Sequence, residues 1–205
     1  MAKKIKRIGL ICSSGGSYGA YGSGTLTRLN RDYCVGIGVS TGSLMTPFAL
    51  LKEWELLKIA YTNIQQSDIF DPKWYKPGPL TSNGHVNILA VIITLLLNQK
   101  SIGSTKNLKS LIDEFFTIDI YNRLNQEFKE FIVLTQNYAQ IPSSIHSFSS
   151  LNETHNSMQD YMYASASPPM LDHWLKKVGK MMKISFMWDF LLMAGLLFYL
   201  GLMKQ

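Results

Sequence analysis

Short apolar runs alternate with segments of helical spacing over the first sixty residues of the chain. Residues 8–12 form a continuous apolar run, which is typical of a strand buried on both faces of a parallel sheet, and residues 33–39 form a second apolar strand. Helices are predicted over residues 20–30 and 43–59, because apolar side chains recur there at helical spacing. This order of strand, glycine-rich loop, helix, strand, turn and helix predicts an α/β fold with a parallel sheet.

The middle of the chain contains fewer regular elements. Residues 65–84 are rich in proline, glycine, asparagine and aromatic residues, which predicts an irregular loop. The apolar run at residues 86–97 is too short to cross a bilayer, so we expect a core or lid helix there. Residues 104–116 have an amphipathic pattern that predicts a helix, residues 131–135 predict a strand, and residues 160–166 predict a short helix.

The C-terminal tail departs from this pattern. Residues 184–203 contain a single charged side chain, Asp189, and are flanked by Lys183 and Lys204. Their length matches the hydrocarbon thickness of a bilayer, which predicts a transmembrane or membrane-anchoring helix. The alternative is a terminal helix of the core, which fits less well because the apolar side chains lie on all sides.

Composition and charge narrow the range of partners. The 205 residues suffice for one domain, and 46% hydrophobic against 17% charged residues is apolar for a soluble protein. The net charge is +6, and the basic residues cluster at two places. The clusters are Lys3, Lys4, Lys6 and Arg7, and Lys176, Lys177, Lys180 and Lys183. They are solvated surface or suit an anionic membrane surface, whereas no basic and aromatic stripe indicates nucleic acid.

Two further features concern the cellular compartment. The cysteines are Cys12 and Cys34, each in an apolar run, so we predict buried reduced thiols without a disulfide framework or a metal site. The apolar stretch after the basic N-terminus is too short for a signal peptide. We therefore expect no signal peptide, a folded domain in the cytoplasm, and association with a membrane.

A serine stands between two glycines where the second strand meets the next helix. Gly38-Val39-Ser40-Thr41-Gly42 has the Gly-x-Ser-x-Gly form, which places a serine hydroxyl on an exposed strand-to-helix turn. There the helix dipole favours developing negative charge. The earlier turn Ser13-Ser14-Gly15-Gly16-Ser17-Tyr18-Gly19 offers backbone N–H groups of the kind that hold an oxyanion. Together the two turns predict a hydrolase site.

The glycine-rich turn can also be interpreted as a dinucleotide-binding loop. That loop requires Gly-x-Gly-x-x-Gly and an acid at the end of the second strand. Ser14 occupies the first glycine position here, and Asp32 precedes the strand that ends at Ser40. We therefore expect no nucleotide cofactor. No metal site is apparent either, because Asp68 and Asp71 are too sparse for a calcium loop.

These motifs resemble those of the patatin-like phospholipases. Residues 14–24 are similar to that family's oxyanion loop and helix start, and the Gly-x-Ser-x-Gly segment is similar to its nucleophile turn. Residues 103–111 resemble the segment leading its mid-domain helix, and Ala164-Ser165-Ala166-Ser167-Pro168-Pro169 resembles the stretch before its catalytic acid. The resemblance covers residues 4–170, which we expect to form a truncated or divergent patatin-like domain.

The resemblance implies a patatin-like parallel-sheet hydrolase core with flanking helices, incomplete at the C-terminus. It implies lipid acyl esters as substrates and a Ser-Asp dyad, and we expect no cofactor. The residues it assigns are the nucleophile Ser40, the nucleophile-turn glycines Gly38 and Gly42, and the oxyanion-hole residues Gly15, Gly16 and Ser17. Ser14 and Tyr18 depart from the family's usual residues, but both leave the backbone donors in place.

The acid of that dyad has no match in this sequence. The family's base lies in an Asp-Gly turn, whereas Asp172 is followed by His173 and Asp189 by Phe190. A serine without its base loses about 10⁴- to 10⁶-fold in turnover, by analogy with serine proteases. Three functions stay open: a lipid acyl hydrolase, an inactive membrane-associated remnant or pseudoenzyme, and a conventional serine hydrolase with a histidine base. The candidates for that base are His85, His146, His155 and His173.

A frame change would explain both the missing acid and the apolar tail. Leu192-Met193-Ala194-Gly195 can be encoded TTG ATG GCG GGG. The same bases, read from the third position of the leucine codon, give GAT GGC GGG, which is Asp-Gly-Gly. We therefore hypothesise that the tail is an out-of-frame translation of the family's catalytic-acid region, with the break after Pro169.

Overall fold

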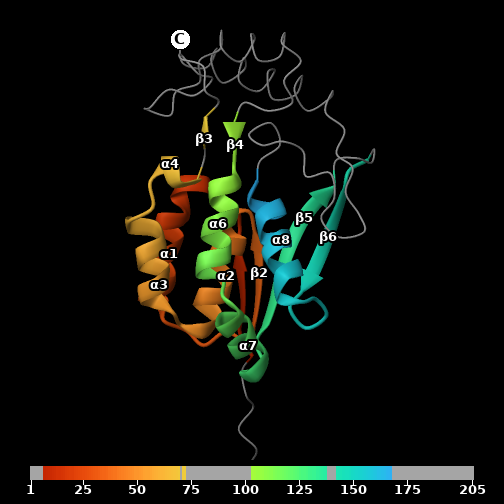
Figure 1. Cartoon of the computed structure of the whole chain (residues 1–205). Coiled ribbons are helices and arrows are strands. Elements are labelled where there is room, and N and C mark those ends of the chain that lie inside the picture. Colours follow the sequence, from red (N-terminus) through yellow and green to blue (C-terminus); the bar gives the residue numbers. More distant parts are fainter. Residues whose placement is uncertain (1–6, 70, 73–102, 138–141, 168–205) are drawn as a thin grey trace, which may run out of the picture.

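The fold is built on a four-stranded sheet with the strand order β1-β2-β5-β6 (Figure 1). It comes from a computed structural model that describes residues 7–69, 71–72, 103–137 and 142–167. The strands are β1 (Gly9–Cys12), β2 (Val35–Val39), β5 (Glu130–Asn137) and β6 (Ser144–Ser149). β1, β2 and β5 are parallel, and β6 pairs antiparallel with β5 at the sheet edge. The predicted α/β class is therefore confirmed.

Helices account for most of the remaining described residues. A 3₁₀ turn at Gly16–Tyr18 leads into the first of them. The helices are α1 (Gly19–Leu29), α2 (Thr41–Leu51), α3 (Trp54–Thr62), α4 (Gln66–Ile69), α6 (Lys106–Phe115), α7 (Ile118–Gln126) and α8 (His155–Ala166). A separate antiparallel pair consists of β3 (Asp71–Pro72) and β4 (Gly103–Ser104).

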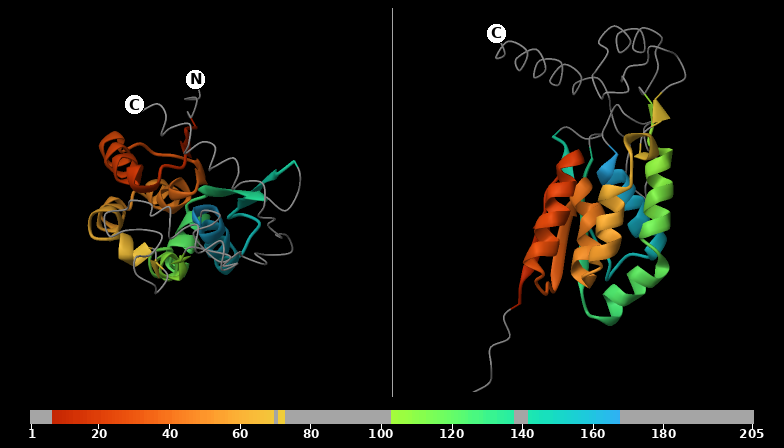
Figure 2. Two further views of the ribbon diagram at one scale, coloured as in Figure 1. Left: turned by 90° about the horizontal axis from the view of Figure 1, so that it is seen from above. Right: turned by 90° about the vertical axis from the view of Figure 1, so that its left-hand side faces the viewer.

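The central helix of the fold is α2. It packs on β1, β2 and β5, and it also contacts α1, α3, α7 and α8. Nine of its residues are buried, as expected for a helix that is surrounded by other elements. α8 packs on β5, whereas α6 packs on α8 and lies farther from the sheet (Figure 2). The carboxyl end of β2 therefore leads directly into a helix that is buried over most of its length.

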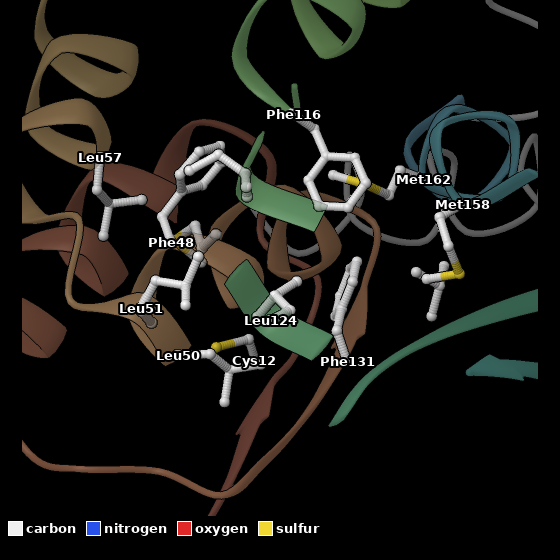
Figure 3. Close-up of a cluster of buried hydrophobic side chains, with 14 of the residues drawn as sticks. Cys12, Phe48, Leu50, Leu51, Leu57, Phe116, Leu124, Phe131, Met158 and Met162 are labelled. Atoms are coloured by element: carbon white, nitrogen blue, oxygen red, sulfur yellow. The ribbon is translucent and has the colours of Figure 1, made fainter. Parts of the chain in front are cut away.

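The hydrophobic core lies between the sheet and the helices that cover it (Figure 3). Phe116 and Phe131 are fully buried, and their rings meet edge to face with centroids 5.9 Å apart. Leu124 from α7 and the two methionines of α8, Met158 and Met162, are buried in the same cluster. Residues from the second half of the chain therefore hold α7 and α8 against the sheet.

The two faces of the sheet differ in burial. Leu10 and Cys12 are buried, and Cys12 contacts Thr46 of α2, whereas Ile11 between them exposes 76% of its surface. The prediction that residues 8–12 are buried on both faces is therefore wrong, because α2 packs only on the face that Leu10 and Cys12 share. The prediction of buried thiols is correct for Cys12 and wrong for Cys34, which is exposed just before β2 begins.

The single helix predicted over residues 43–59 is two helices. α2 ends where Lys52 adopts a left-handed conformation with φ 59°, and α3 begins two residues later. The N–H of Glu53 donates to the carbonyl oxygen of Phe48 at 2.8 Å, which closes the end of α2 as in a Schellman motif. Glycine usually takes this conformation, so the lysine gave no signal of the break.

Other predicted elements agree with the structure to different degrees. The helix at residues 104–116 and the strand at 131–135 correspond to α6 and β5. The predictions omitted α7, β6 and the first turn of α8, where the Thr154 hydroxyl accepts a hydrogen bond from the N–H of Ser157. The predictions over residues 86–97 and 184–203, and most of the loop at 65–84, fall outside the described residues.

Candidate functional site

The two glycine-rich turns lie side by side at the carboxyl edge of the sheet. β1 and β2 run parallel, with Cys12 opposite Gly38, so the residues after both strands leave the sheet at the same edge. A Cβ atom placed on Gly42 would lie 2.8 Å from the carbonyl oxygen of Ser13. The start of the first turn therefore touches the turn that carries Ser40.

Ser40 has a strained backbone. Its φ is 52° and its ψ is −127°, and it precedes the first residue of α2. A side chain at positive φ costs about 1–3 kcal/mol and persists only where the surrounding structure enforces it. The strain results from the abrupt change of direction between β2 and α2. Such a turn directs the serine side chain away from the sheet edge.

Both glycines of the motif are required by close backbone contacts. A Cβ atom on Gly38 would lie 2.5 Å from the Cα atom of Ser43. A Cβ atom on Gly42 would lie 2.1 Å from the carbonyl oxygen of Cys12. In both cases the obstructing atoms belong to the backbone and cannot rotate away. The first and last positions of Gly-x-Ser-x-Gly therefore admit no side chain without moving a strand or a helix.

The turn after β1 is compact and exposed. Gly16 has a φ of 52°, and no atom lies within 4 Å of the position where its Cβ would be. The N–H of Tyr18 donates to the carbonyl oxygen of Gly15 at 3.0 Å, which closes the turn before α1 begins. Gly15 and Gly16 are exposed. Their backbone groups are accessible at the edge of the sheet beside Ser40.

Serine hydroxyls hold the backbone of Ser40 on both sides. The N–H of Ser40 donates to Oγ of Ser165 at 2.8 Å, and the same Oγ donates to the carbonyl oxygen of Leu134 at 2.6 Å. On the other side, Oγ of Ser43 donates to the carbonyl oxygen of Ser40 at 2.6 Å. The role of Ser165 was not predicted, although it belongs to the Ala-Ser segment. The missing information was that the end of α8 lies next to the turn after β2.

Two titratable side chains, the buried Cys12 and the partly buried Tyr61, lie beneath the turn. Burial raises the pKa of the Cys12 thiol, and a hydrogen bond with Thr46 lowers it by a smaller amount. Burial, together with the nearby Cys12, raises the pKa of the Tyr61 phenol above its ordinary value. The Tyr61 hydroxyl donates to the carbonyl oxygen of Thr41 at 3.3 Å. Both groups are neutral near pH 7, so this support for the turn carries no charge.

Within the described ranges, no carboxylate or imidazole forms a hydrogen bond with the Ser40 hydroxyl. Nε2 of His155 donates to the carbonyl oxygen of Phe116 at 2.8 Å, and its ring stacks on the Phe116 ring. His146 lies on the edge strand β6, where Nε2 contacts Oγ of Ser144 at 2.9 Å. The other candidates, His85, His173, Asp172 and Asp189, lie outside the described residues.

The described part of the chain was also searched for a metal site and for a pocket. No three His, Cys, Asp or Glu side chains lie there in an arrangement that could hold a metal ion. A groove of about 600 Å³ runs between α1 and α3, with Trp54, Lys58 and Tyr61 among its lining residues. Ser40 does not line it, so the groove is separate from the two turns.

Comparison with known proteins identifies the family. The fold and the tight serine turn define an α/β protein with the architecture of a hydrolase core. Residues 10–186 match the family described as patatin-like phospholipase. The chain belongs to the patatin-like phospholipase family, which makes it a lipid acyl hydrolase at the level of the family and implies lipid or ester substrates. No curated protein and no solved structure matches it significantly.

The described helices do not include a membrane span. None of them is both long enough and apolar enough to cross a bilayer. The predicted span at residues 184–203 lies outside the part of the chain that was searched. Its membrane role is therefore treated below as a proposal.

Proposed function

We propose that this chain hydrolyses lipid acyl esters with Ser40 as nucleophile and with the turn at residues 15–17 as oxyanion hole. The observation that supports this most directly is the strained Ser40 backbone between Gly38 and Gly42, packed against the end of β1. Backbone strain of this kind clusters at functional sites, because it is otherwise removed by substitution. Family membership supplies the substrate class.

The proposed reaction has two steps. The Ser40 oxygen attacks the ester carbonyl carbon, and its proton passes to a base. The carbonyl oxygen becomes an oxyanion that accepts hydrogen bonds from the backbone N–H groups of Gly15, Gly16 and Ser17, beside the positive end of the α2 dipole. The carbon–oxygen bond to the alcohol then breaks and the alcohol takes up the proton. Water hydrolyses the acyl-enzyme in the second step.

The base would be an aspartate, as the family resemblance implies. Asp172 lies within the residues that match the family, whereas Asp189 lies beyond them. Asp172 is followed by His173 and so lacks the family's Asp-Gly turn, and we propose it as the first candidate on its position within the matched residues alone. Replacement of Asp172 by asparagine preserves the shape of the side chain but exchanges the basic carboxylate for a neutral amide. An Asp172→Asn variant that keeps wild-type turnover would remove Asp172 from the mechanism.

The second candidate function is an inactive patatin-like remnant that retains the fold. It is favoured by the absence of an Asp-Gly turn and by the lack of a basic partner for the Ser40 hydroxyl among the described residues. The out-of-frame hypothesis for the tail would explain why the Asp-Gly turn is missing. The nucleotide sequence tests that explanation: codons at residues 192–195 that cannot encode Asp-Gly in the alternative frame would exclude it.

Covalent labelling distinguishes the two candidates. A fluorophosphonate probe is added to the full chain, to Ser40→Ala and to Ser147→Ala, a control at an exposed serine on β6. We expect wild-type and Ser147→Ala protein to be labelled and Ser40→Ala to remain unlabelled. A folded wild-type chain that takes no label would favour the remnant. Labelling that disappears after replacement of one histidine would instead indicate a conventional serine hydrolase.

We further propose that the chain works at a membrane surface with this domain in the cytoplasm. The lysines at 176, 177, 180 and 183 precede the apolar run at 184–203, and each adds about 1 kcal/mol near an anionic surface. Replacement of all four by glutamine should weaken sedimentation with phosphatidylglycerol vesicles and leave binding to phosphatidylcholine vesicles unchanged. Equal sedimentation of both proteins with anionic vesicles would contradict the electrostatic part of this proposal.

A further inference from the structure

The hydroxyl of Ser165 connects three separate elements at the candidate site. Ser165 lies in the last turn of α8, and Ser40 lies 125 residues earlier in the chain. Its Oγ accepts from the N–H of Ser40 at 2.8 Å and donates to the carbonyl oxygen of Leu134 at 2.6 Å. Leu134 belongs to β5, so one side chain joins α8, β5 and the turn after β2.

The Ser165 hydroxyl bridges backbone groups of β5 and of the turn after β2, at the point where direct pairing between the two strands ends. Val39 is the last residue of β2 and lies opposite Leu134 of β5. Beyond this pair the chain turns away from β5 at Ser40, which separates its N–H from the carbonyl oxygen of Leu134. Ser165 is placed between these two groups and satisfies both, so the strand can end abruptly without leaving a polar backbone group unpaired.

We propose that Ser165 is a positioning residue that holds Ser40 in its strained conformation, and this inference rests on the proposed function of Ser40. The positive φ of Ser40 needs an enforcing contact, because the free energy of an unconstrained serine is lower at negative φ. The hydrogen bond to Ser165 supplies that contact from outside the local chain. Its short partner distances are those of well-formed O–H and N–H hydrogen bonds.

The same contact determines which donors can serve the oxyanion. Because the N–H of Ser40 is occupied by Ser165, it does not take part in oxyanion binding. The N–H of Ser43 donates to the carbonyl oxygen of Ser40 at 2.8 Å and is occupied as well. The donors that can face a substrate are then those of the turn after β1 and the first N–H groups of α2, which have no partner within the helix.

Ser165 is itself held in a rigid surrounding. The N–H of Ser167 donates to the carbonyl oxygen of Tyr163 at 2.9 Å, which closes the last turn of α8. The hydroxyl of Tyr163 lies 3.0 Å from Oγ1 of Thr105, next to the start of α6. The end of α8 is thereby fixed against a second helix, so its serine can act as a stable anchor for the turn.

A serine elsewhere in the fold offers a matched control. Oγ of Ser150 accepts from the N–H of Phe131 at 3.1 Å, at the opposite end of β5. Both serines therefore accept a hydrogen bond from a backbone N–H, that of Phe131 in β5 for Ser150 and that of Ser40 just after β2 for Ser165. Ser150 is fully buried and lies away from the carboxyl edge. Ser150→Ala thus removes a comparable bond without touching the candidate site.

The first experiment compares labelling of Ser40 by a fluorophosphonate in wild type, Ser165→Ala, Ser165→Thr and Ser150→Ala. Ser165→Ala should lower the labelling rate about 10- to 100-fold, because small misplacement of a reacting group has effects of this size. Ser165→Thr retains the hydroxyl and should recover most of the rate. Ser150→Ala should lower thermal stability while the labelling rate of the folded protein stays at the wild-type value.

The second experiment measures the contact itself and does not depend on activity. Hydrogen exchange at the Ser40 amide is followed by mass spectrometry on peptides covering residues 38–43. Ser165→Ala should accelerate this exchange, whereas Ser150→Ala should not accelerate it selectively. If the wild type takes no label, the proposed function fails while exchange still decides the role of Ser165. Unchanged exchange and labelling in Ser165→Ala, or an equal fall of labelling in Ser150→Ala, would overturn the inference.

Discussion

Substitution of Gly42 by alanine tests the closeness of the two turns. Gly42 lies in the first turn of α2, and an added Cβ atom would lie 2.1 Å from the carbonyl oxygen and 2.6 Å from the carbonyl carbon of Cys12. A carbon and a carbonyl oxygen normally stay about 3.3 Å apart even in close contacts. The end of β1 and the start of α2 must therefore separate by about 1 Å.

The energetic cost follows from this displacement. Overpacking of a well-packed site usually costs about 1–3 kcal/mol, and rigid backbone on both sides places this case near the upper value. The higher helix propensity of alanine than of glycine offsets up to about 1 kcal/mol of this loss in stability. The net loss is then about 2 kcal/mol. For a domain of this size, that loss corresponds to a fall in Tm of about 4–8 °C.

Gly24 supplies a control for Gly42. It also lies in a helix, α1, but no atom is within 4 Å of the position of its added Cβ. Gly24→Ala should therefore show only the helix preference and raise Tm by about 2–4 °C. Thermal unfolding is followed by far-UV circular dichroism for both variants. A Gly42→Ala protein that unfolds within about 1 °C of wild type, or a shift of both variants in one direction, would refute the reasoning.

Two further substitutions address the strain at Ser40 and the support beneath it. Ser40→Gly should abolish fluorophosphonate labelling. It should also raise the free energy of unfolding by about 1 kcal/mol, because glycine adopts a positive φ without the cost that serine has. A lower stability of this variant in urea unfolding would argue against strain at Ser40. The raised pKa of Tyr61 means that its neutral form is kept in the folded state, so its contribution is full below about pH 10 and is lost as the pH rises further. The stability advantage of wild type over Tyr61→Phe should therefore shrink between about pH 10 and about pH 11.5 in urea unfolding, by up to about 1.4 kcal/mol per pH unit. A constant difference between the two proteins over that interval would exclude a titration of Tyr61.

Much of the framework around Ser40 could be predicted because its signals are local. The apolar runs that became β1 and β2 each lie within a few residues, and glycine or serine follows each of them directly. Gly-x-Ser-x-Gly specifies a tight turn through the size of its glycines, and the structure requires glycine at both positions. The family and the α/β class followed from the same residues.

Other features escaped prediction because their causes are distant in the chain. The break between α2 and α3 occurs at Lys52, which is left-handed although it is not a glycine, so the sequence did not indicate the end of α2. The exposure of Ile11 depends on which face of the sheet α2 covers, and an apolar run gives no information about that. β6 contains polar and exposed positions, and its pairing with β5 as an edge strand only becomes visible in three dimensions.

Residues close together in the chain were thus enough to indicate the strands, the glycine turns and the family, since steric limits on the backbone act over a few neighbours. Only the tertiary structure shows which residue holds Ser40 in its strained conformation. Its amide reaches Ser165 across 125 residues of sequence. That contact exists because α8 packs on β5 beside β2, an arrangement set by burial of the aromatic and methionine side chains of the core.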